Sequence, residues 1–583
     1  MRSVRLLSLA SCGVFSLQFV ALHGLGPDGR DISLEQLAGC VGCVALGALA
    51  WTLASSLGAR VFFATVFGLA FAAQALALRQ FGAGLDTHFV ESAQAAWVDV
   101  KPSAMPLLPT LLGAGLFACF VEGFVLSVGR SPAPRKASFA LAGVALAGLW
   151  FGPAPDHATP EIRLAFGLRR LFQSRAAAPY GVVDLSPIRS AKGELPSVLF
   201  VLTESIRASD YCAAPRASCD VAPEVNALLP GRIALSELRS IASYTAISVA
   251  ALSTGNTQLG TREQIALAPT FFDYLRALEG SPVRTACFSA HDKEGLWERA
   301  NIEDSIGTFV MFEHLDDKPG SRDRVLVDAF EAYIRAEAGP VFAMLHFYGT
   351  HAPYYAAEDS SPLQPTTQAA SWDTLAPLHN QYKNAILTQD RQLARGLRAF
   401  IETRTGPWVI LFTSDHGEAF GEHHAIHHGQ SLFDEQIHVP GFVAFGGGAL
   451  SAREAATLAE RAAGPTLHLD FLPTVLDLYG IWDSLSVFHR RISMLGSSLL
   501  RSAPAAPRAI PMTNCTASTP CPLNTWGMLG DHHALVGQVW DSDFSCVPLD
   551  DSGRVMGDAP ECTALRTTSK TYFQKLPNRK PNR

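Results

Sequence analysis

Residues 407–417 read "PWVILFTSDHG", an apolar run that ends in a carboxylate and an imidazole. A short, continuous apolar run bounded by Pro and Gly is typical of a strand that is buried on both faces. Three more stretches have the same form: "SVLFVLTES" (197–205), "PVFAMLHFYG" (340–349) and "VPGFVAFGG" (439–447). Stretches with helical periodicity, such as "SRDRVLVDAFEAYIRAEA" (321–338), separate them. This alternation predicts an α/β domain with a mostly parallel central sheet covered by helices on both faces.

Polar residues follow three of these predicted strands. Glu204 ends one strand, His351 comes just after "HFYG", and Asp415 with His416 ends the run quoted above. Ligands collect at the carboxyl ends of the strands in such sheets. Two carboxylates and an imidazole form a mixed oxygen and nitrogen donor set that suits Zn²⁺ or Mn²⁺. Each residue alone could form a strand-end ion pair or a turn, and it is their combination that favours a metal site.

The stretch "SYTAISVAALSTG" (243–255) has one conspicuous hydroxyl, that of Thr245. A threonine hydroxyl is almost never ionised near neutral pH, and no His or Lys is adjacent in sequence to activate it. A divalent metal could lower the pKa of this hydroxyl and prepare it for attack. The pattern predicts a helix that starts at Thr245, so backbone N–H groups and the helix dipole would face a bound anion. An ordinary helix N-cap is the alternative.

Three motifs carry a resemblance to a known family. The stretch "TSDHGEAFGEHHAIHHGQSLFDEQIHVPG" (413–441) resembles the metal- and phosphate-binding region of the alkaline phosphatase superfamily, in its sulfatase-like branch. "HLDFLPTVLDLYG" (468–480) is similar to a later helix of that branch. "TAISVAALSTG" (245–255) aligns with the sulfatase nucleophile motif Cys/Ser-x-Pro-Ser-Arg-x-x-x-x-Thr-Gly, with Thr245 at the nucleophile position. The likeness covers about residues 195–500, with the motifs in the family's order.

The resemblance implies roles for individual side chains. His351 ("YGTHAPYY") and His428 would bind phosphoryl oxygens and help to protonate the leaving group, although each could be a surface loop histidine. His428 is preferred to its histidine neighbours because it directly precedes Gly429, as in the family motif. The resemblance also implies one divalent metal, Zn²⁺ or Mn²⁺, with four ligands: Glu204, Thr245, Asp415 and His416.

Apolar, nearly uncharged stretches dominate the chain up to about residue 155, and most approach the ~20 residues that a membrane helix needs. Buried helices of a soluble protein, or a cleaved signal peptide for the first stretch, are the alternatives. The distribution of Lys and Arg predicts an N-terminus inside and residues after about 155 outside. The five predicted spans are Leu6–Leu25, Leu37–Leu57, Val61–Leu78, Met105–Val128 and Ala137–Pro153.

The cysteines agree with an oxidising compartment. Close spacing suggests the pairs Cys212–Cys219, Cys515–Cys521 and Cys546–Cys562, with Cys287 left over, although connectivity cannot be read from a sequence. The formal net charge of -7 gives no indication of nucleic-acid binding.

Four segments are predicted: a transmembrane domain (1–155), a linker segment (156–194), a sulfatase-like catalytic domain (195–505) and a Cys-containing C-terminal extension (506–583). The linker segment contains a basic amphipathic stretch, which could lie on the membrane surface or form an ordinary surface helix. After about residue 505 the strand–helix alternation gives way to Pro- and Cys-rich loops.

Residue 245 separates two branches of the family. Sulfatases use a formylglycine made from Cys or Ser, and threonine cannot form it. Together with the apolar spans, the chain resembles the membrane-bound phosphoethanolamine and phosphoglycerol transferases. The resemblance implies a multi-pass protein of the bacterial inner (cytoplasmic) membrane, with a periplasmic or extracellular catalytic domain.

The implied partners are the membrane, a phospholipid donor and a lipid or glycan acceptor, and the implied intermediate is phospho-threonine. A phosphate- or sulfate-ester hydrolase is the first alternative, because only water would replace the acceptor. A catalytically inactive membrane sensor is the second, and the intact set of Glu204, Thr245, Asp415 and His416 argues against it.

Overall fold

The computed structural model divides the chain into two compact units, Met1–Ala176 with Ala369–Trp372, and Ala177–Gln368 with Asp373–Arg583. The structure describes residues 56–81, 108–127, 183, 185–257, 265, 268–291, 302–311, 321–357, 359, 361–429, 431–491, 494–514, 526–537, 544–549 and 560–572.

Two helices are described in the first unit, α3 (Leu57–Phe81) and α6 (Leu108–Ser127). α3 contains the predicted span Val61–Leu78, and α6 lies within the predicted span Met105–Val128, so the prediction of helix is confirmed for these described residues. Of the helices that the structure describes, none combines the length and the apolarity that a membrane crossing requires. The other three predicted spans, and the predicted amphipathic stretch, lie outside the described residues.

Glycine lets α3 and α6 approach each other closely. A Cβ on Gly68 would lie 2.5 Å from the backbone nitrogen of Cys119, and one on Gly115 would lie 2.9 Å from the Leu69 side chain. Small residues at such crossings allow the backbones of two helices to come into contact. The pair therefore packs through its small residues and directs many of its large apolar side chains outward, including Phe62, Leu116, Phe117 and Phe120.

The second unit contains a seven-stranded sheet with the order β2-β10-β7-β1-β6-β4-β5. Strand β10 runs antiparallel to both of its neighbours, and the other pairings are parallel. The predicted mostly parallel sheet is thus confirmed, and each of the four apolar runs noted in the sequence forms a strand. The strands are β1 (Ser197–Thr203), β2 (Ile233–Ala234), β4 (Arg284–Ser289), β5 (Thr308–Met311), β6 (Val341–His346), β7 (Trp408–Ser414) and β10 (Gly441–Gly446).

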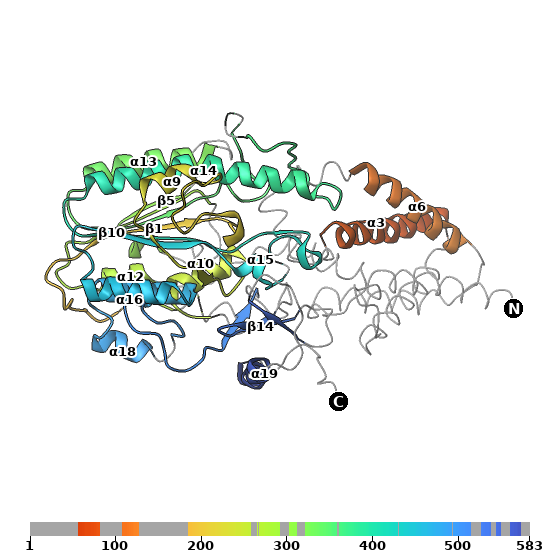
Figure 1. Cartoon of the computed structure of the whole chain (residues 1–583). Coiled ribbons are helices and arrows are strands. Elements are labelled where there is room, and N and C mark those ends of the chain that lie inside the picture. The colour runs from red at the N-terminus through yellow and green to blue at the C-terminus, as the bar shows by residue number, and fades with distance from the viewer. Residues whose placement is uncertain are drawn as a thin grey trace. The chain divides into compact units, whose positions relative to one another are not determined.

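Helices cover both faces of this sheet, as Figure 1 shows for the labelled elements. One layer contains α9 (Pro223–Leu228), α13 (Arg322–Ala336) and α14 (Leu375–Thr403). The other contains α10 (Thr245–Thr254), α12 (Phe271–Arg276) and α16 (Ala452–Ala462). α17 (Phe471–Leu478) packs against α10 and α12. The remaining short helices are α15 (Asp434–Ile437), α18 (Leu485–Arg491) and the 3₁₀ turns Ala208–Asp210, Ile302–Ser305, Glu422–His424 and His468–Asp470.

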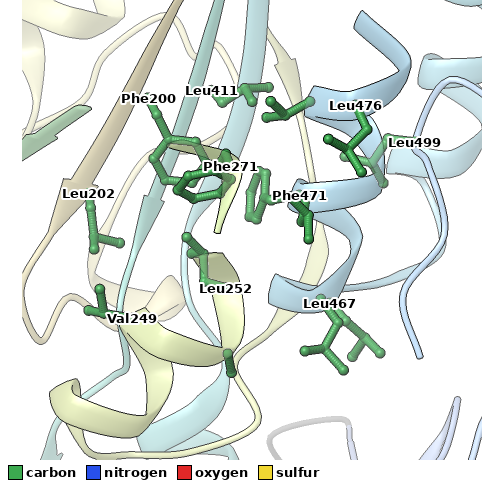
Figure 2. Close-up of a cluster of buried hydrophobic side chains, with 14 of the residues drawn as sticks. Phe200, Leu202, Val249, Leu252, Phe271, Leu411, Leu467, Phe471, Leu476 and Leu499 are labelled. Carbon is green, nitrogen blue, oxygen red and sulfur yellow. The ribbon is translucent and has the colours of Figure 1, made fainter. Parts of the chain in front are cut away.

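The main hydrophobic core lies between the sheet and the layer that contains α10 (Figure 2). The Phe200 ring on β1 lies 5.6 Å from the Phe271 ring of α12 and 5.2 Å from the Phe471 ring of α17, measured between centroids. Leu252 of α10 belongs to the same cluster. Every residue of β1 is buried. This packing fixes the position of α10 relative to the carboxyl end of β1.

The C-terminal extension is not a set of loops, so that prediction is wrong. It forms a four-stranded antiparallel sheet followed by a helix. Alternate residues face opposite ways: Leu529 belongs to the main core, while Met528 contacts the apolar cluster beneath the C-terminal helix. The strands are too short for this period to be visible in the sequence. The elements are β12 (Ile510–Thr513), β13 (Trp526–Leu529), β14 (His533–Gly537), β15 (Ser545–Pro548) and α19 (Pro560–Tyr572).

Two small sheets lie beside the main one, a parallel pair formed by β3 (Glu237–Arg239) with β11 (Pro465–Leu467) and a hairpin formed by β8 (Ala419–Phe420) with β9 (Ile426–His427). Two predicted disulfides are confirmed, Cys212–Cys219 and Cys546–Cys562, and the second joins β15 to α19. Cys287 is a buried free thiol, and the predicted pair Cys515–Cys521 lies outside the described residues.

Candidate active site

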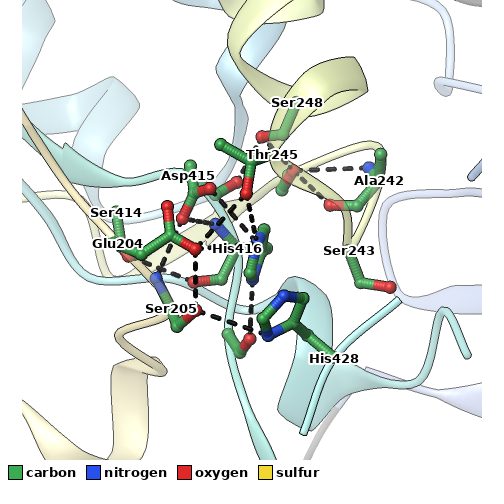
Figure 3. Close-up of polar contacts among 12 residues, drawn as sticks. Glu204, Ser205, Ala242, Ser243, Thr245, Ser248, Ser414, Asp415, His416 and His428 are labelled. Atoms are coloured by element: carbon green, nitrogen blue, oxygen red, sulfur yellow. Dashed lines mark hydrogen bonds and ion pairs between the residues drawn. The ribbon is translucent and has the colours of Figure 1, made fainter. Parts of the chain in front are cut away.

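The candidate site is built at the carboxyl ends of β1 and β7 and at the first residue of α10 (Figure 3). These strands are parallel neighbours with Thr203 opposite Ser414, so the residues that follow them, Glu204 and Asp415, are brought side by side. Packing of α10 on the same core places Thr245 above them. The expectation that strand-end residues meet at one edge of the sheet is therefore met.

Side-chain atoms of four residues face one point. Thr245 Oγ1 lies 3.3 Å from Glu204 Oε1 and 3.2 Å from His416 Nε2. His416 Nε2 lies 3.2 Å from Asp415 Oδ2 and 3.4 Å from Glu204 Oε1. All four residues are buried; Thr245 is the most accessible of them, with 7% of its surface exposed. The structure thus brings together the four residues predicted as metal ligands.

These residues fit a divalent metal on the chemistry and spacing of their donor atoms. Ligands held tetrahedrally at 2.0–2.2 Å from Zn²⁺ lie roughly 3.3 Å from one another, which is the separation found here. Asp415 Oδ2 is buried and has no hydrogen-bond partner among the described residues. Buried polar atoms are nearly always paired, so an orphaned carboxylate oxygen aimed into the cluster indicates a cation.

Hydrogen bonds hold two of the ligands in orientation. Asp415 Oδ1 accepts from the backbone N–H groups of Ser205 (2.9 Å) and His416 (2.7 Å), which turns Oδ2 toward the cluster. His416 Nδ1 lies 2.9 Å from the Gly417 carbonyl oxygen. That contact places the ring proton on Nδ1 and leaves the Nε2 lone pair facing the cluster. Ser248 Oγ donates to the Asp415 carbonyl.

Burial and mutual charge shift the pKa values of these groups. Burial opposes ionisation of Glu204, but the charge of neighbouring histidines, His291 first, outweighs burial and holds the pKa of Glu204 well below the usual range. Burial and the Glu204 charge raise the pKa of Asp415 well above its usual value. Burial also lowers the pKa of His416 to about 4, so this imidazole is neutral. Two buried carboxylates repel each other, and a bound cation would offset that repulsion.

Two predicted histidines lie at the mouth of the site. The His428 ring centroid lies 4.2 Å from that of His416 and 5.7 Å from that of His351. His428 Nδ1 lies 3.3 Å from Glu418 Oε1, and its side chain is 15% exposed. His351 follows β6 by five residues rather than ending it; the strand-end histidine of β6 is His346. Both predicted histidines therefore share the site, and their roles remain predictions.

Several site residues were missed in the sequence. Ser205 has a left-handed backbone (φ 56°) and links three neighbours: its N–H bonds Asp415, and its hydroxyl lies 3.0 Å from Glu204 Oε1 and 3.5 Å from His428 Nδ1. Glu418 is fully buried beside His428. Glu418 could have been predicted as a site residue, because it lies only two residues after His416 in the sequence. No pattern in the sequence marked Ser205.

The C-terminal extension also reaches the site. Asn514, directly after β12, accepts from the Ser243 N–H (2.8 Å) and donates to Ser243 Oγ (2.9 Å) and to the Gly429 carbonyl (3.1 Å). Ser243 precedes the helix that starts at Thr245, and Gly429 follows His428. One buried amide therefore joins the loop that precedes Thr245 to the loop that follows His428.

Comparisons with known proteins agree with this architecture. Residues 196–481 match the sulfatase family model. An uncharacterized sulfatase of Escherichia coli K12, YidJ, is 34% identical over 93 residues, which are 16% of this chain and 17% of that protein's length. The integral membrane lipooligosaccharide phosphoethanolamine transferase A (EptA) of Neisseria meningitidis has a similar fold, with a TM-score of 0.58 and 18% identity over 83% of this chain and 96% of that one.

A phosphonate monoester hydrolase of Silicibacter pomeroyi gives a TM-score of 0.48 and 16% identity over 65% of this chain and 94% of that one. Together with the parallel sheet and the strand-end cluster, the match to the sulfatase family model places residues 196–481 of this chain in the sulfatase family, within the alkaline phosphatase superfamily.

Proposed function

We propose that this chain is a metal-dependent phosphotransferase. It moves a phospholipid head-group phosphoryl unit, phosphoethanolamine or phosphoglycerol, to a lipid or glycan acceptor of the cell envelope. The observation that carries the proposal is the hydroxyl of Thr245, which lies 3.3 Å from Glu204 and 3.2 Å from His416 at the start of a buried helix. Phosphoethanolamine transfer is the activity named for the Neisseria protein of similar fold.

Glu204, Thr245, Asp415 and His416 would hold one divalent metal, Zn²⁺ or Mn²⁺. When bound, the metal supplies positive charge that favours ionisation of the Thr245 hydroxyl. The chain itself fixes the attacking oxygen, because Thr245 Oγ1 donates a hydrogen bond to Glu204 Oε1 and its β-branched side chain has restricted rotamers. The N-terminal end of α10 adds a favourable field for the negative phosphoryl group.

In the first half-reaction, the Thr245 oxygen, ionised after its proton has passed to solvent, forms a bond to phosphorus while the bond from phosphorus to the diacylglycerol oxygen breaks. The leaving oxygen takes a proton from His428 or His351, and phospho-threonine remains. In the second, an acceptor hydroxyl attacks phosphorus, gives its proton back to the same histidine and releases the Thr245 oxygen in its ionised form. The Glu418 carboxylate can accept the Nδ1–H of His428, which leaves Nε2 for this exchange.

The proposed reaction needs access to lipid substrates, and a location in the membrane would provide it. The helices α3 and α6 expose large apolar side chains, which suits a lipid environment better than water. The disulfides Cys212–Cys219 and Cys546–Cys562 favour an oxidising compartment for the catalytic domain. We therefore place the chain in the bacterial inner membrane, as a multi-pass protein with the catalytic domain in the periplasm.

The test is turnover of defined donors by the purified full-length chain. Phosphatidylethanolamine or phosphatidylglycerol with labelled acyl chains should yield labelled diacylglycerol, and Thr245→Ala should abolish that product. Thr245→Ser should retain part of the activity, since the attacking oxygen is kept. Mass spectrometry of lipids and glycans from cells with and without the gene would then identify the acceptor. Diacylglycerol release that is unchanged in Thr245→Ala would refute the proposal, and phosphate release without any modified acceptor would favour a hydrolase.

A further inference from the structure

Glu204 has a second oxygen, and it faces away from Thr245. Oε1 points into the cluster described above, whereas Oε2 faces two histidines from the other side of β1. His346 ends β6, the parallel neighbour of β1, and lies in register with Leu202. His346 is also in register with Ser289, the last residue of β4, and His291 follows two residues later. Three adjacent strands therefore deliver Glu204, His346 and His291 to one place.

The geometry of this second cluster is compact and enclosed. Glu204 Oε2 lies 3.2 Å from His291 Nε2 and 3.9 Å from His346 Nε2. The two imidazole rings stack with their centroids 4.0 Å apart, and one ligand atom from each of the three residues lies within 4.8 Å of the others. The three side chains are at most 3% exposed.

Ordinary hydrogen bonding does not account for the cluster. Neither Glu204 Oε2 nor His346 Nε2 has a hydrogen-bond partner among the residues that the structure describes. Their separation of 3.9 Å is too long for a direct hydrogen bond. His291 Nε2 lies 3.1 Å from the Phe347 carbonyl oxygen and 3.2 Å from Glu204 Oε2, so a proton on Nε2 would serve these two oxygens and leave His346 Nε2 unpaired. A cation in place of that proton would contact both Nε2 atoms and Oε2, with the His291 proton then on Nδ1. A fully buried carboxylate oxygen and a fully buried imidazole nitrogen thus point at each other without a shared proton.

We propose that Glu204 Oε2, His291 Nε2 and His346 Nε2 form a second divalent-cation site, for which Zn²⁺ is the best match. Two imidazoles and one carboxylate are a zinc-type donor set, and they disfavour Mg²⁺ and Ca²⁺, which prefer oxygen ligands. His346 Nδ1 lies 3.4 Å from Ser289 Oγ, so Nε2 is the nitrogen left to bind metal. The Phe347 carbonyl oxygen is positioned as a further ligand.

The consequence is that Glu204 would bridge two cations through its two oxygens. The second cation would not contact Thr245, and it would position Glu204 from behind the reacting cluster. His291 and His346 are therefore positioning residues rather than catalytic ones. This inference is independent of the substrate, since it rests on the buried donor atoms alone.

The test is metal stoichiometry of the purified full-length chain. After chelation, the protein is titrated with Zn²⁺, desalted and measured by elemental analysis. Wild type should retain two zinc ions per chain. His346→Gln, His291→Gln and His416→Ala should each retain one zinc ion per chain, because each variant loses a ligand of one site. His533→Gln is the matched control, because His533 pairs with Glu561 in the C-terminal extension and its loss should leave two. Circular dichroism would verify that each variant is folded.

A wild-type chain that saturates at one zinc ion would overturn the proposal, even if a histidine variant failed to fold. Retention of two zinc ions by both His346→Gln and His291→Gln would overturn it as well. With Co²⁺ in place of Zn²⁺, the visible absorption should develop in two phases in wild type. His346→Gln should show one of those phases.

Discussion

Replacing Asn514 with alanine should weaken the fold and the active site together. Asn514 is fully buried, and its amide makes three hydrogen bonds, two to Ser243 and one to the Gly429 carbonyl. At about 1 kcal/mol for each buried hydrogen bond, the loss amounts to ~3 kcal/mol of unfolding free energy. The change also frees the loops that precede Thr245 and follow His428. A misplacement of reacting groups by about 1 Å can lower the rate a hundredfold.

Denaturant unfolding and donor turnover measure the two effects on Asn514→Ala. Metal content should stay at the wild-type level, because Glu204, Asp415 and His416 are untouched. Asn380→Ala is the matched control, since its amide makes one exposed hydrogen bond to the Pro365 carbonyl, and it should change stability by less than about 0.5 kcal/mol. If Asn514→Ala matched wild type in both stability and turnover, the inferred link between the extension and the active site would be wrong.

Three further outcomes are expected. Asp415→Ala or His416→Ala should remove the metal shared with Thr245, and elemental analysis showing unchanged occupancy in both would eliminate that site. Burial raises the pKa of Asp390 to about 7, so the folded chain keeps a proton that the unfolded chain loses above its usual pKa. The contribution of Asp390 to stability should therefore fall as pH rises from about 4 to 7, and the difference in unfolding free energy between wild type and Asp390→Asn should change with pH in that window; a curve for Asp390→Asn that runs parallel to wild type would contradict this. Cys546→Ser removes a disulfide to Cys562, 16 residues away, and should cost about 3 kcal/mol in thermal or denaturant unfolding, whereas an unchanged midpoint would argue against the disulfide.

The sequence predicts the catalytic fold well because its strands are buried on both faces. Runs such as 197–205 and 407–417 contain little besides apolar residues, and such runs leave few alternatives to a parallel sheet. The candidate site follows from the same logic, since Glu204 and Asp415 are placed by two neighbouring strand ends. Thr245 was found because "TAISVAALSTG" aligns with the sulfatase nucleophile motif, with Thr245 at the nucleophile position.

Contacts made across long sequence separations could not be predicted. Asn514 and Ser243 are 271 residues apart, and neither belongs to a recognisable pattern. The pairing of Glu204 with His291 and His346 depends on the order of β1, β6 and β4 in the sheet, which the sequence does not state. The short strands of the C-terminal extension show no visible period, because each strand contributes only two or three residues to either face.

Covalent trapping tests the central claim most directly. The full-length chain is incubated with phosphatidylethanolamine or phosphatidylglycerol and no acceptor, digested and examined by peptide mass spectrometry. The proposed mechanism predicts the mass of the head-group phosphoryl unit on the peptide that contains Thr245, and no such mass in Thr245→Ala. Donor turnover without any adduct on Thr245, together with full activity in Thr245→Ala, would contradict the account.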